Sequence, residues 1–219
     1  MISLGFVRKT GEFLADAFTL DDVGRRAHAC RRSSVMLLFA AYSERPNGAV
    51  EEFLRGVSDY HAHSGQHTDV YCVGYSIDRY IKPDNYEGRE FRLPAYSEPL
   101  STFYPGIFHE VRYDLQSRLR GYWEYDGGVH VLVFSTTGDR ENPVDWEYCA
   151  VVTSRRHVGR IYDDVEQMLR DTFNHAERCA EGLSPNELGP YLKRKEMLAG
   201  TRRVASAIGG DILGGLFGK

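Results

Sequence analysis

A chain of 219 residues is long enough to bury a sizeable core in one domain, so it needs no disulfide framework or structural metal for stability. Its apolar share of 42% and charged share of 26% are those of an ordinary globular protein and exclude a largely disordered one. The net charge of −4 is uneven, because the stretch from Pro190 to the end carries six Lys or Arg residues and two acids and leaves the remainder acidic. An acidic body disfavours nucleic-acid binding by the core, so the basic tail is the part of the chain that could bind nucleic acid or another anionic partner.

The cysteines and the first residues indicate a reduced, cytoplasmic protein. The four cysteines (Cys30, Cys72, Cys149, Cys179) lie far apart without a Cys-x-x-Cys pair, which argues against a zinc ribbon and a thioredoxin-type redox motif. The first nine residues lack the basic start and apolar stretch of a secretory signal. We therefore expect a cytoplasmic location and no cofactor.

The first third of the chain predicts two short helices and then a βαβ unit. Amphipathic spacing indicates a helix over residues 12–18, and Thr19 is suited to cap a second helix that runs toward Cys30. The apolar run 33–42 is typical of a strand covered on both faces. A helix that ends near Gly65 separates it from the β-rich run 69–76. Two strands joined in this way are expected to be parallel.

Residues 77–105 form a long segment rich in proline and aromatic residues, with a short strand near 91–93. Loops of this length in a compact domain are commonly functional, and Tyr, Phe and Arg are enriched in protein interfaces. We therefore expect a partner-docking surface here; the alternative is a loop folded onto its own domain. The partner-binding candidates are Tyr80, Tyr86, Phe91, Tyr96 and Tyr104.

The second half predicts a helix, a meander and a last helix. An amphipathic helix follows Pro105, and residues 121–125 lead through Asp126-Gly127, a strong hairpin signal, into a strand over 129–134. Residues 146–153 predict a further strand. The clearest helical pattern extends from 161 to 179.

These elements predict an α/β fold with a mixed sheet of about five strands, made of the βαβ half and an antiparallel meander, with helices on its faces. The order resembles the thioredoxin-like arrangement of a βαβ half followed by a ββα half. The resemblance covers topology alone: the Cys-x-x-Cys motif is absent, and no proline precedes the strand that begins at Val129. It implies no functional residues.

The loop that follows the strand at 129–134 is a candidate ligand site. Its hydroxyls and arginine could hold a phosphate group, as the ends of strands in α/β proteins often do. The alternative is ordinary turn chemistry between two antiparallel strands. The candidate residues are Ser135, Thr136, Thr137, Asp139 and Arg140.

Two other patterns have simpler explanations than chemistry. His61, His63 and His67 could ligate a metal, but Ser64-Gly65 interrupts the helix and we predict no metal site. Trp-Glu-Tyr occurs at 123–125 and at 146–148, where Glu124 and Glu147 could act as an acid/base pair. Cross-strand aromatic packing explains the same residues, and we favour it.

The chain divides into a core domain over 1–182 and a basic, glycine-rich tail over 183–219. Apolar and small residues repeat every fourth position in the tail, which permits close helix packing, and five glycines between 209 and 218 make an isolated helix unstable. The tail is too short and too charged to span a membrane, but a basic helix could lie on an anionic membrane surface; the alternative is a frayed terminus. The partner-binding candidates in the tail are Ile208, Gly210, Ile212, Gly214 and Leu216.

The leading functional hypothesis is a non-catalytic subunit of a larger assembly, which binds a protein partner or itself through the 77–105 segment and the tail. The alternative is an enzyme or sensor that binds a phosphate-bearing or nucleotide ligand at the 135–141 loop. A weaker alternative is peripheral membrane attachment by the tail.

Overall fold

The computed structural model describes most of the core domain. Its described residues are 2–4, 19–44, 48–63, 68–77, 88–120, 122–154 and 165–180. The predicted helix over 12–18 and the whole 183–219 tail lie outside them.

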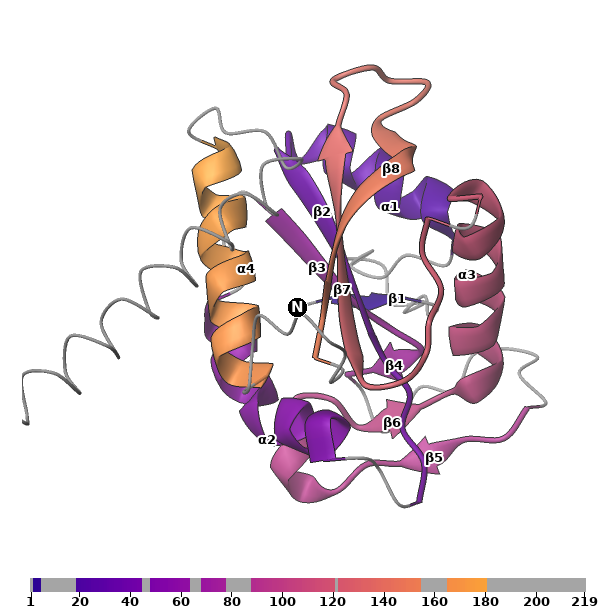
Figure 1. The fold of residues 1–219 in the computed structure, drawn as a ribbon, viewed down its shortest axis with the longest axis vertical. Coiled ribbons are helices and arrows are strands. Elements are labelled where there is room, and N and C mark those ends of the chain that lie inside the picture. The colour runs from indigo at the N-terminus through magenta and orange to yellow at the C-terminus, as the bar shows by residue number, and fades with distance from the viewer. Residues whose placement is uncertain are drawn as a thin grey trace, which may run out of the picture.

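A mixed five-stranded sheet forms the centre of the molecule (Figure 1). Its order is β1-β3-β2-β7-β8, in which β1 and β2 run parallel to β3, β7 runs antiparallel to β2, and β8 runs antiparallel to β7. The predicted parallel βαβ unit and the α/β class are thus confirmed. The strands are β1 (Ile2–Leu4), β2 (Ser34–Ala40), β3 (Thr68–Val73), β7 (Val129–Thr136) and β8 (Val144–Thr153).

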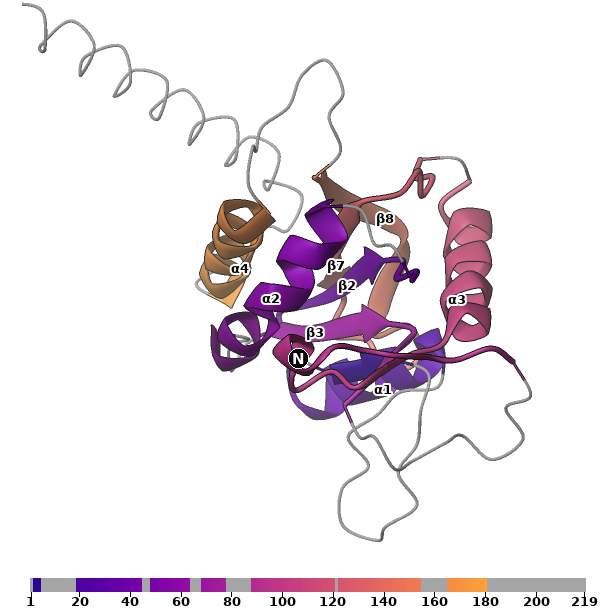
Figure 2. The ribbon, with the colours of Figure 1, turned by 90° about the horizontal axis from the view of Figure 1, so that it is seen from below.

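Four helices cover the sheet in the described part of the chain: α1 (Leu20–Ala29), α2 (Gly48–His63), α3 (Pro105–Arg118) and α4 (Val165–Ala180). Helices α2 and α4 pack together on one face, and α3 lies on the other (Figures 1 and 2). Both faces of β2 are therefore covered, which explains why every residue of this strand is buried. None of the described helices has the length and apolar character required to cross a membrane.

Helix α1 begins where the sequence predicts. The Thr19 hydroxyl accepts a hydrogen bond from the Asp22 N–H, and the Asp22 carboxylate accepts one from the Thr19 N–H, which completes a capping box. The C-terminal half of the helix is tied to the sheet by Arg26, whose Nε lies 3.2 Å from the carboxylate of Asp69 on β3. Arg32 Nε lies 3.0 Å from the same carboxylate, so this buried anion has two cationic partners.

The strand predicted over residues 121–125 is wrong. Residues 122–128 form an irregular connection from α3 to β7, and β1 takes the fifth place in the sheet. Trp123 and Tyr125 place their rings against Phe39 of β2, at 4.7 and 6.3 Å between centroids, instead of pairing with β7. The predicted cross-strand pairing of the two Trp-Glu-Tyr segments is therefore wrong as well.

The run predicted as one strand over 69–76 is broken by Gly74, which has a φ of +78° and turns the chain into a second sheet. This sheet has the order β4-β6-β5 and includes part of the aromatic-rich segment that we expected to be mainly irregular. Its elements are β4 (Tyr75–Ser76), β5 (Phe91–Arg92), the short helix η1 (Ala95–Ser97) and β6 (Thr102–Phe103).

Candidate partner-binding groove

A large bulge interrupts the β7–β8 hairpin. The pairing is regular as far as Phe134 and Cys149, and it resumes where Thr136 pairs with Val144. Ser135 alone therefore lies opposite residues 145–148 of β8. Such bulges bend a strand and re-aim its side chains, and they are frequent beside functional sites.

The bulge directs its residues toward the end of α3. The Trp146 ring packs against Phe134, with centroids 4.9 Å apart and an angle of 61° between the rings. The Glu147 N–H donates a hydrogen bond of 3.1 Å to Asp145 Oδ1. Both carboxylates are exposed, so the bulge presents one partly buried indole between two anions.

A groove of about 490 Å³ lies between this bulge and the C-terminal end of α3. Two of its lining residues, Val144 and Trp146, are apolar, and the others can form hydrogen bonds or ion pairs. The lining residues are Ser117, Arg118, Arg120, Thr137, Asn142, Val144, Asp145, Trp146 and Glu147.

Charges of both signs line the groove. Arg118 Nε donates a hydrogen bond of 2.9 Å to Asp114 one turn earlier, which holds its guanidinium beside the groove. Arg120 follows the C-cap of α3 with a φ of 47°, in the left-handed region where glycine is usual and a side chain costs about 1–2 kcal/mol. Across the groove stand Asp145 and Glu147. The groove therefore suits a ligand that carries both positive and negative groups.

Exposed tyrosines lie on α3 and on the connection that follows it. Tyr113 is 64% exposed, with the Arg112 guanidinium 4.5 Å from its ring centre, and Tyr122 is 80% exposed. Tyrosine, tryptophan and arginine are the residues that contribute most to protein interfaces. This side of the molecule thus presents all three.

The connection before β7 is held by a buried polar network that the sequence did not indicate. Trp123 Nε1–H donates a hydrogen bond of 3.1 Å to Nδ1 of His130, so the imidazole proton is on Nε2, which lies 2.8 Å from Asp126 Oδ1. His130 is 3% exposed, and the Tyr125 ring lies 4.9 Å from it. The network fixes the connection over the same face of the sheet as α3.

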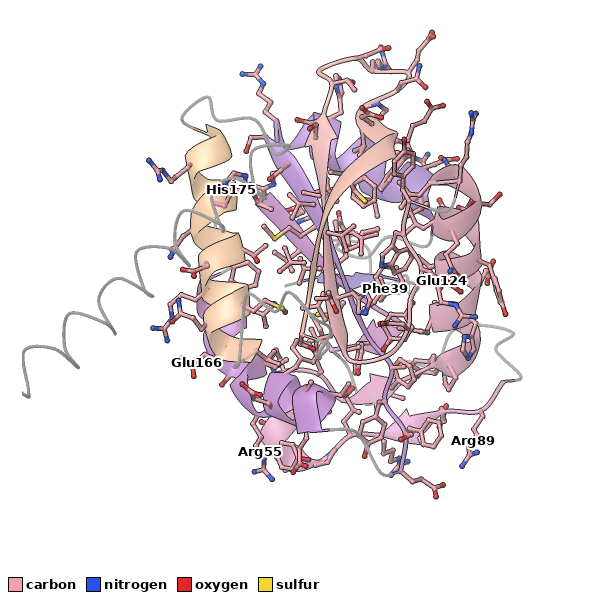
Figure 3. The ribbon with its side chains drawn as sticks, viewed as in Figure 1. Phe39, Arg55, Arg89, Glu124, Glu166 and His175 are labelled. Atoms are coloured by element: carbon pink, nitrogen blue, oxygen red, sulfur yellow. The ribbon has the colours of Figure 1, made fainter. Side chains whose placement is uncertain are left out.

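The described part of the aromatic-rich segment packs mainly onto its own domain. Phe91 is half-buried beneath the Arg89 guanidinium, and Tyr96 is partly exposed beneath Arg55; each guanidinium lies 4.4 Å from the ring centre. Both arginines extend from the end of the molecule that carries the small sheet (Figure 3). Tyr104 is 3% exposed, so its side chain belongs to the core. The other predicted partner-binding residues, Tyr80, Tyr86, Ile208, Gly210, Ile212, Gly214 and Leu216, lie outside the described residues.

The hydroxyl groups of the 135–141 loop are used within the chain. Thr136 Oγ1 donates to a backbone carbonyl at 2.7 Å, Thr137 Oγ1 donates to another and accepts from the Asp139 N–H, and Asp139 Oδ1 accepts from a later N–H of the loop. Ser135 is half-buried and Arg140 is exposed. These bonds are the turn chemistry expected as the alternative, and the ligand site stays a prediction.

No group of three or more metal-ligating side chains occurs among the residues that the structure describes. His61 and His63 end α2, and His67 is outside the described ranges. Glu124 and Glu147 are both exposed and lie on different elements, the α3–β7 connection and the β8 bulge.

The fold is α/β, and an open groove lined mainly by polar residues lies at one edge of the central sheet. No family model, curated protein or solved structure matches the chain.

Proposed function

We propose that the protein is a cytoplasmic, non-catalytic subunit of a larger assembly, which binds an extended segment of a protein partner in the groove between α3 and the β8 bulge. The observation that carries the proposal is the bulge itself. In the bulge, four residues of β8 (145–148) lie opposite the single residue Ser135 of β7. Trp146 and the carboxylates of Asp145 and Glu147 therefore line the same groove as Arg118 and Arg120.

The chemistry of the groove favours a peptide over a small molecule. Sites for small molecules are usually enclosed and mainly apolar, with a few polar groups. This groove is open, and seven of its nine lining residues are polar or charged, with an indole as its large apolar surface. A peptide supplies backbone donors and acceptors along its length, and side chains of either charge can meet the opposed charges of Arg120 and Asp145.

The proposal includes the partner contacts expected from the sequence. Tyr96 remains partly exposed beside Arg55, which suits a second, smaller contact. The basic tail is the other element proposed to bind. Removal of residues 200–219 is expected to lower the mass of the recovered assembly, measured by light scattering.

Selection of displayed random peptides on the full-length chain tests the groove. We expect peptides of mixed charge whose affinity falls at least tenfold on Arg120→Glu or Trp146→Ala. The matched control is Arg140→Glu, which makes the same charge change at an exposed residue of the hairpin loop outside the groove. Selected peptides that bind the groove variants and the wild type equally would overturn the proposal.

The nucleotide alternative is tested with the same proteins. A panel of nucleotides and divalent metals is expected to leave the melting temperature unchanged, whereas a ligand at 100 times its Kd adds about 2.7 kcal/mol to the free energy of unfolding. A shift that Arg140→Glu removes would show that the 135–141 loop binds a nucleotide. A shift that Arg120→Glu removes would show that the groove binds one and would refute peptide docking.

A further inference from the structure

Two oppositely charged side chains line the groove without pairing with each other. Arg120 follows the end of α3, and Glu147 belongs to the β8 bulge on the other wall. Among the described residues, the Arg120 guanidinium and the Glu147 carboxylate form no ion pair or hydrogen bond with another side chain. Both residues are exposed. The groove therefore offers one available cation on one wall and one available anion on the other.

The other two charges of the groove are already engaged. Arg118 Nε donates a hydrogen bond of 2.9 Å to Asp114 Oδ1, and Asp145 Oδ1 accepts one of 3.1 Å from the Glu147 N–H. An occupant with charges of a single sign would cover either Arg120 or Glu147 without giving it a partner, and covering an unpaired charge is costly. An occupant with both signs gives each of these charges a partner.

The indole of Trp146 decides where the positive group of the occupant belongs. Its ring packs against Phe134, and the residue lies next to Glu147 and lines the same groove. Tryptophan is the aromatic residue that attracts lysine and arginine side chains most strongly. A basic side chain over this indole also meets the Glu147 carboxylate. The acidic group of the occupant then belongs on the opposite wall, where the guanidinium of Arg120 can bind a carboxylate through two parallel hydrogen bonds.

We propose that the groove binds a segment of a partner protein that carries one basic and one acidic side chain. The basic side chain lies over Trp146 beside Glu147, and the acidic one binds Arg120. This inference rests on the proposed function and adds to it the chemistry and the orientation of the partner segment. Arg120 and Glu147 are then the residues that determine which segment is bound.

The conformation of Arg120 allows its side chain to be removed without harm to the fold. Arg120 is the first residue after the C-cap of α3 and has a φ of 47°, a position at which glycine is the most favourable residue. Helix α1 ends in the same way at the exposed residue Arg31, which has a φ of 51° and does not line the groove. Arg31→Gly is therefore a matched control for Arg120→Gly.

Charge exchange between the groove and a peptide tests the assignment. The probes are the tightest peptide selected on the full-length chain and its synthetic derivatives, in which each acidic residue in turn is changed to lysine and each basic residue to glutamate. One derivative of each kind is expected to bind the wild type at least about tenfold more weakly. Arg120→Glu should restore binding of the lysine derivative, and Glu147→Lys should restore binding of the glutamate derivative.

Glycine substitution separates binding from folding. Arg120→Gly is expected to keep or raise the Tm and to weaken binding of the selected peptide at least about tenfold, whereas Arg31→Gly should keep the wild-type affinity. Equal affinities of the two glycine variants overturn the inference. Groove-dependent peptides that carry charges of one sign, or that no charge exchange rescues, also overturn it but leave the groove as the peptide site. A library without any peptide whose binding depends on Trp146 overturns the proposed function as well.

Discussion

Gly74 provides a sharp test of how the two sheets are joined. It lies between β3 and β4 with a φ of +78°, and its carbonyl accepts a hydrogen bond of 2.8 Å from the Tyr104 N–H. A Cβ added at this position would lie 2.9 Å from Phe108 Cβ and 3.1 Å from both a ring carbon of Phe103 and the Tyr104 carbonyl oxygen. The substitution Gly74→Ala therefore combines backbone strain with steric overlap.

The two costs can be separated with Gly138. This residue has the same φ of +78°, but a Cβ there has no atom within 4 Å. Gly138→Ala should cost about 1–2 kcal/mol for the left-handed conformation, and Gly74→Ala should cost a further 1–3 kcal/mol or so for overpacking against α3 and β6. In both variants, alanine also makes the unfolded chain less flexible, which stabilises the folded protein by about 0.4–1 kcal/mol. This contribution is the same at the two positions, so it cancels when their free energies of unfolding are compared.

Urea unfolding at 25 °C measures the difference as a change in midpoint at constant slope. For a domain of this size, each kcal/mol also lowers the Tm by about 2–4 °C. Gly74→Ala should thus melt at a lower temperature than Gly138→Ala. Equal free energies of unfolding would refute the tight approach of the β3–β4 turn to α3.

Three further perturbations follow from the same packing. Gly24→Ala would place a Cβ 2.8 Å from Pro143 Cγ. Overpacking of about 1–3 kcal/mol, less the roughly 1 kcal/mol that alanine gains over glycine inside helix α1, should give a net loss of up to about 2 kcal/mol, and Pro143→Ala should recover part of this loss in a double-mutant cycle. Trp123→Phe removes the indole N–H that donates to Nδ1 of buried His130 and should cost about 1–3 kcal/mol in urea unfolding; an unchanged midpoint would contradict the hydrogen bond. Burial raises the pKa of Cys72 from 9.0 to about 12. The unfolded thiol therefore loses its proton first, so the free energy of unfolding should fall as the pH rises above 9 by up to about 1.4 kcal/mol per pH unit, and Cys72→Ala should flatten this fall.

The βαβ half was predictable because its signals are local. The apolar run of β2 and the three- and four-residue spacing along α2 need no knowledge of the rest of the chain. The same holds for α1, whose capping box lies within four consecutive residues. Burial then follows from topology, since β2 has a neighbouring strand on each edge and helices on both faces of the sheet.

The irregular connection before β7 was mistaken for a strand because its aromatic residues alternate. Trp123 and Tyr125 alternate in burial as a strand would, but their partners are Phe39 and His130 rather than a neighbouring backbone. An alternating sequence pattern indicates which side chains are buried, but it does not show whether a neighbouring strand or other side chains bury them. Asp126-Gly127 does form a turn before β7, but the segment that precedes this turn is not a strand, so no hairpin results.

Elements that depend on distant partners could not be predicted. Strand β1 has three residues and exists as a strand because it pairs with β3. In the small sheet, β5 was predicted as the short strand near 91–93 and β4 as the end of the 69–76 run, whereas β6 has two residues, too few for a periodic pattern. The groove could not be predicted for the same reason. Its bulge arises from a shift in the pairing of β7 with β8, and no local sequence pattern indicates where that shift occurs.

The two edges of the central sheet differ in a way that bears on assembly. Strand β1 is three residues long, and a short edge offers little to a pairing strand. Strand β8 is ten residues long and divides into a charged, bulged part and an uncharged, regular part. The bulged part lines the groove, and the regular part pairs with β7.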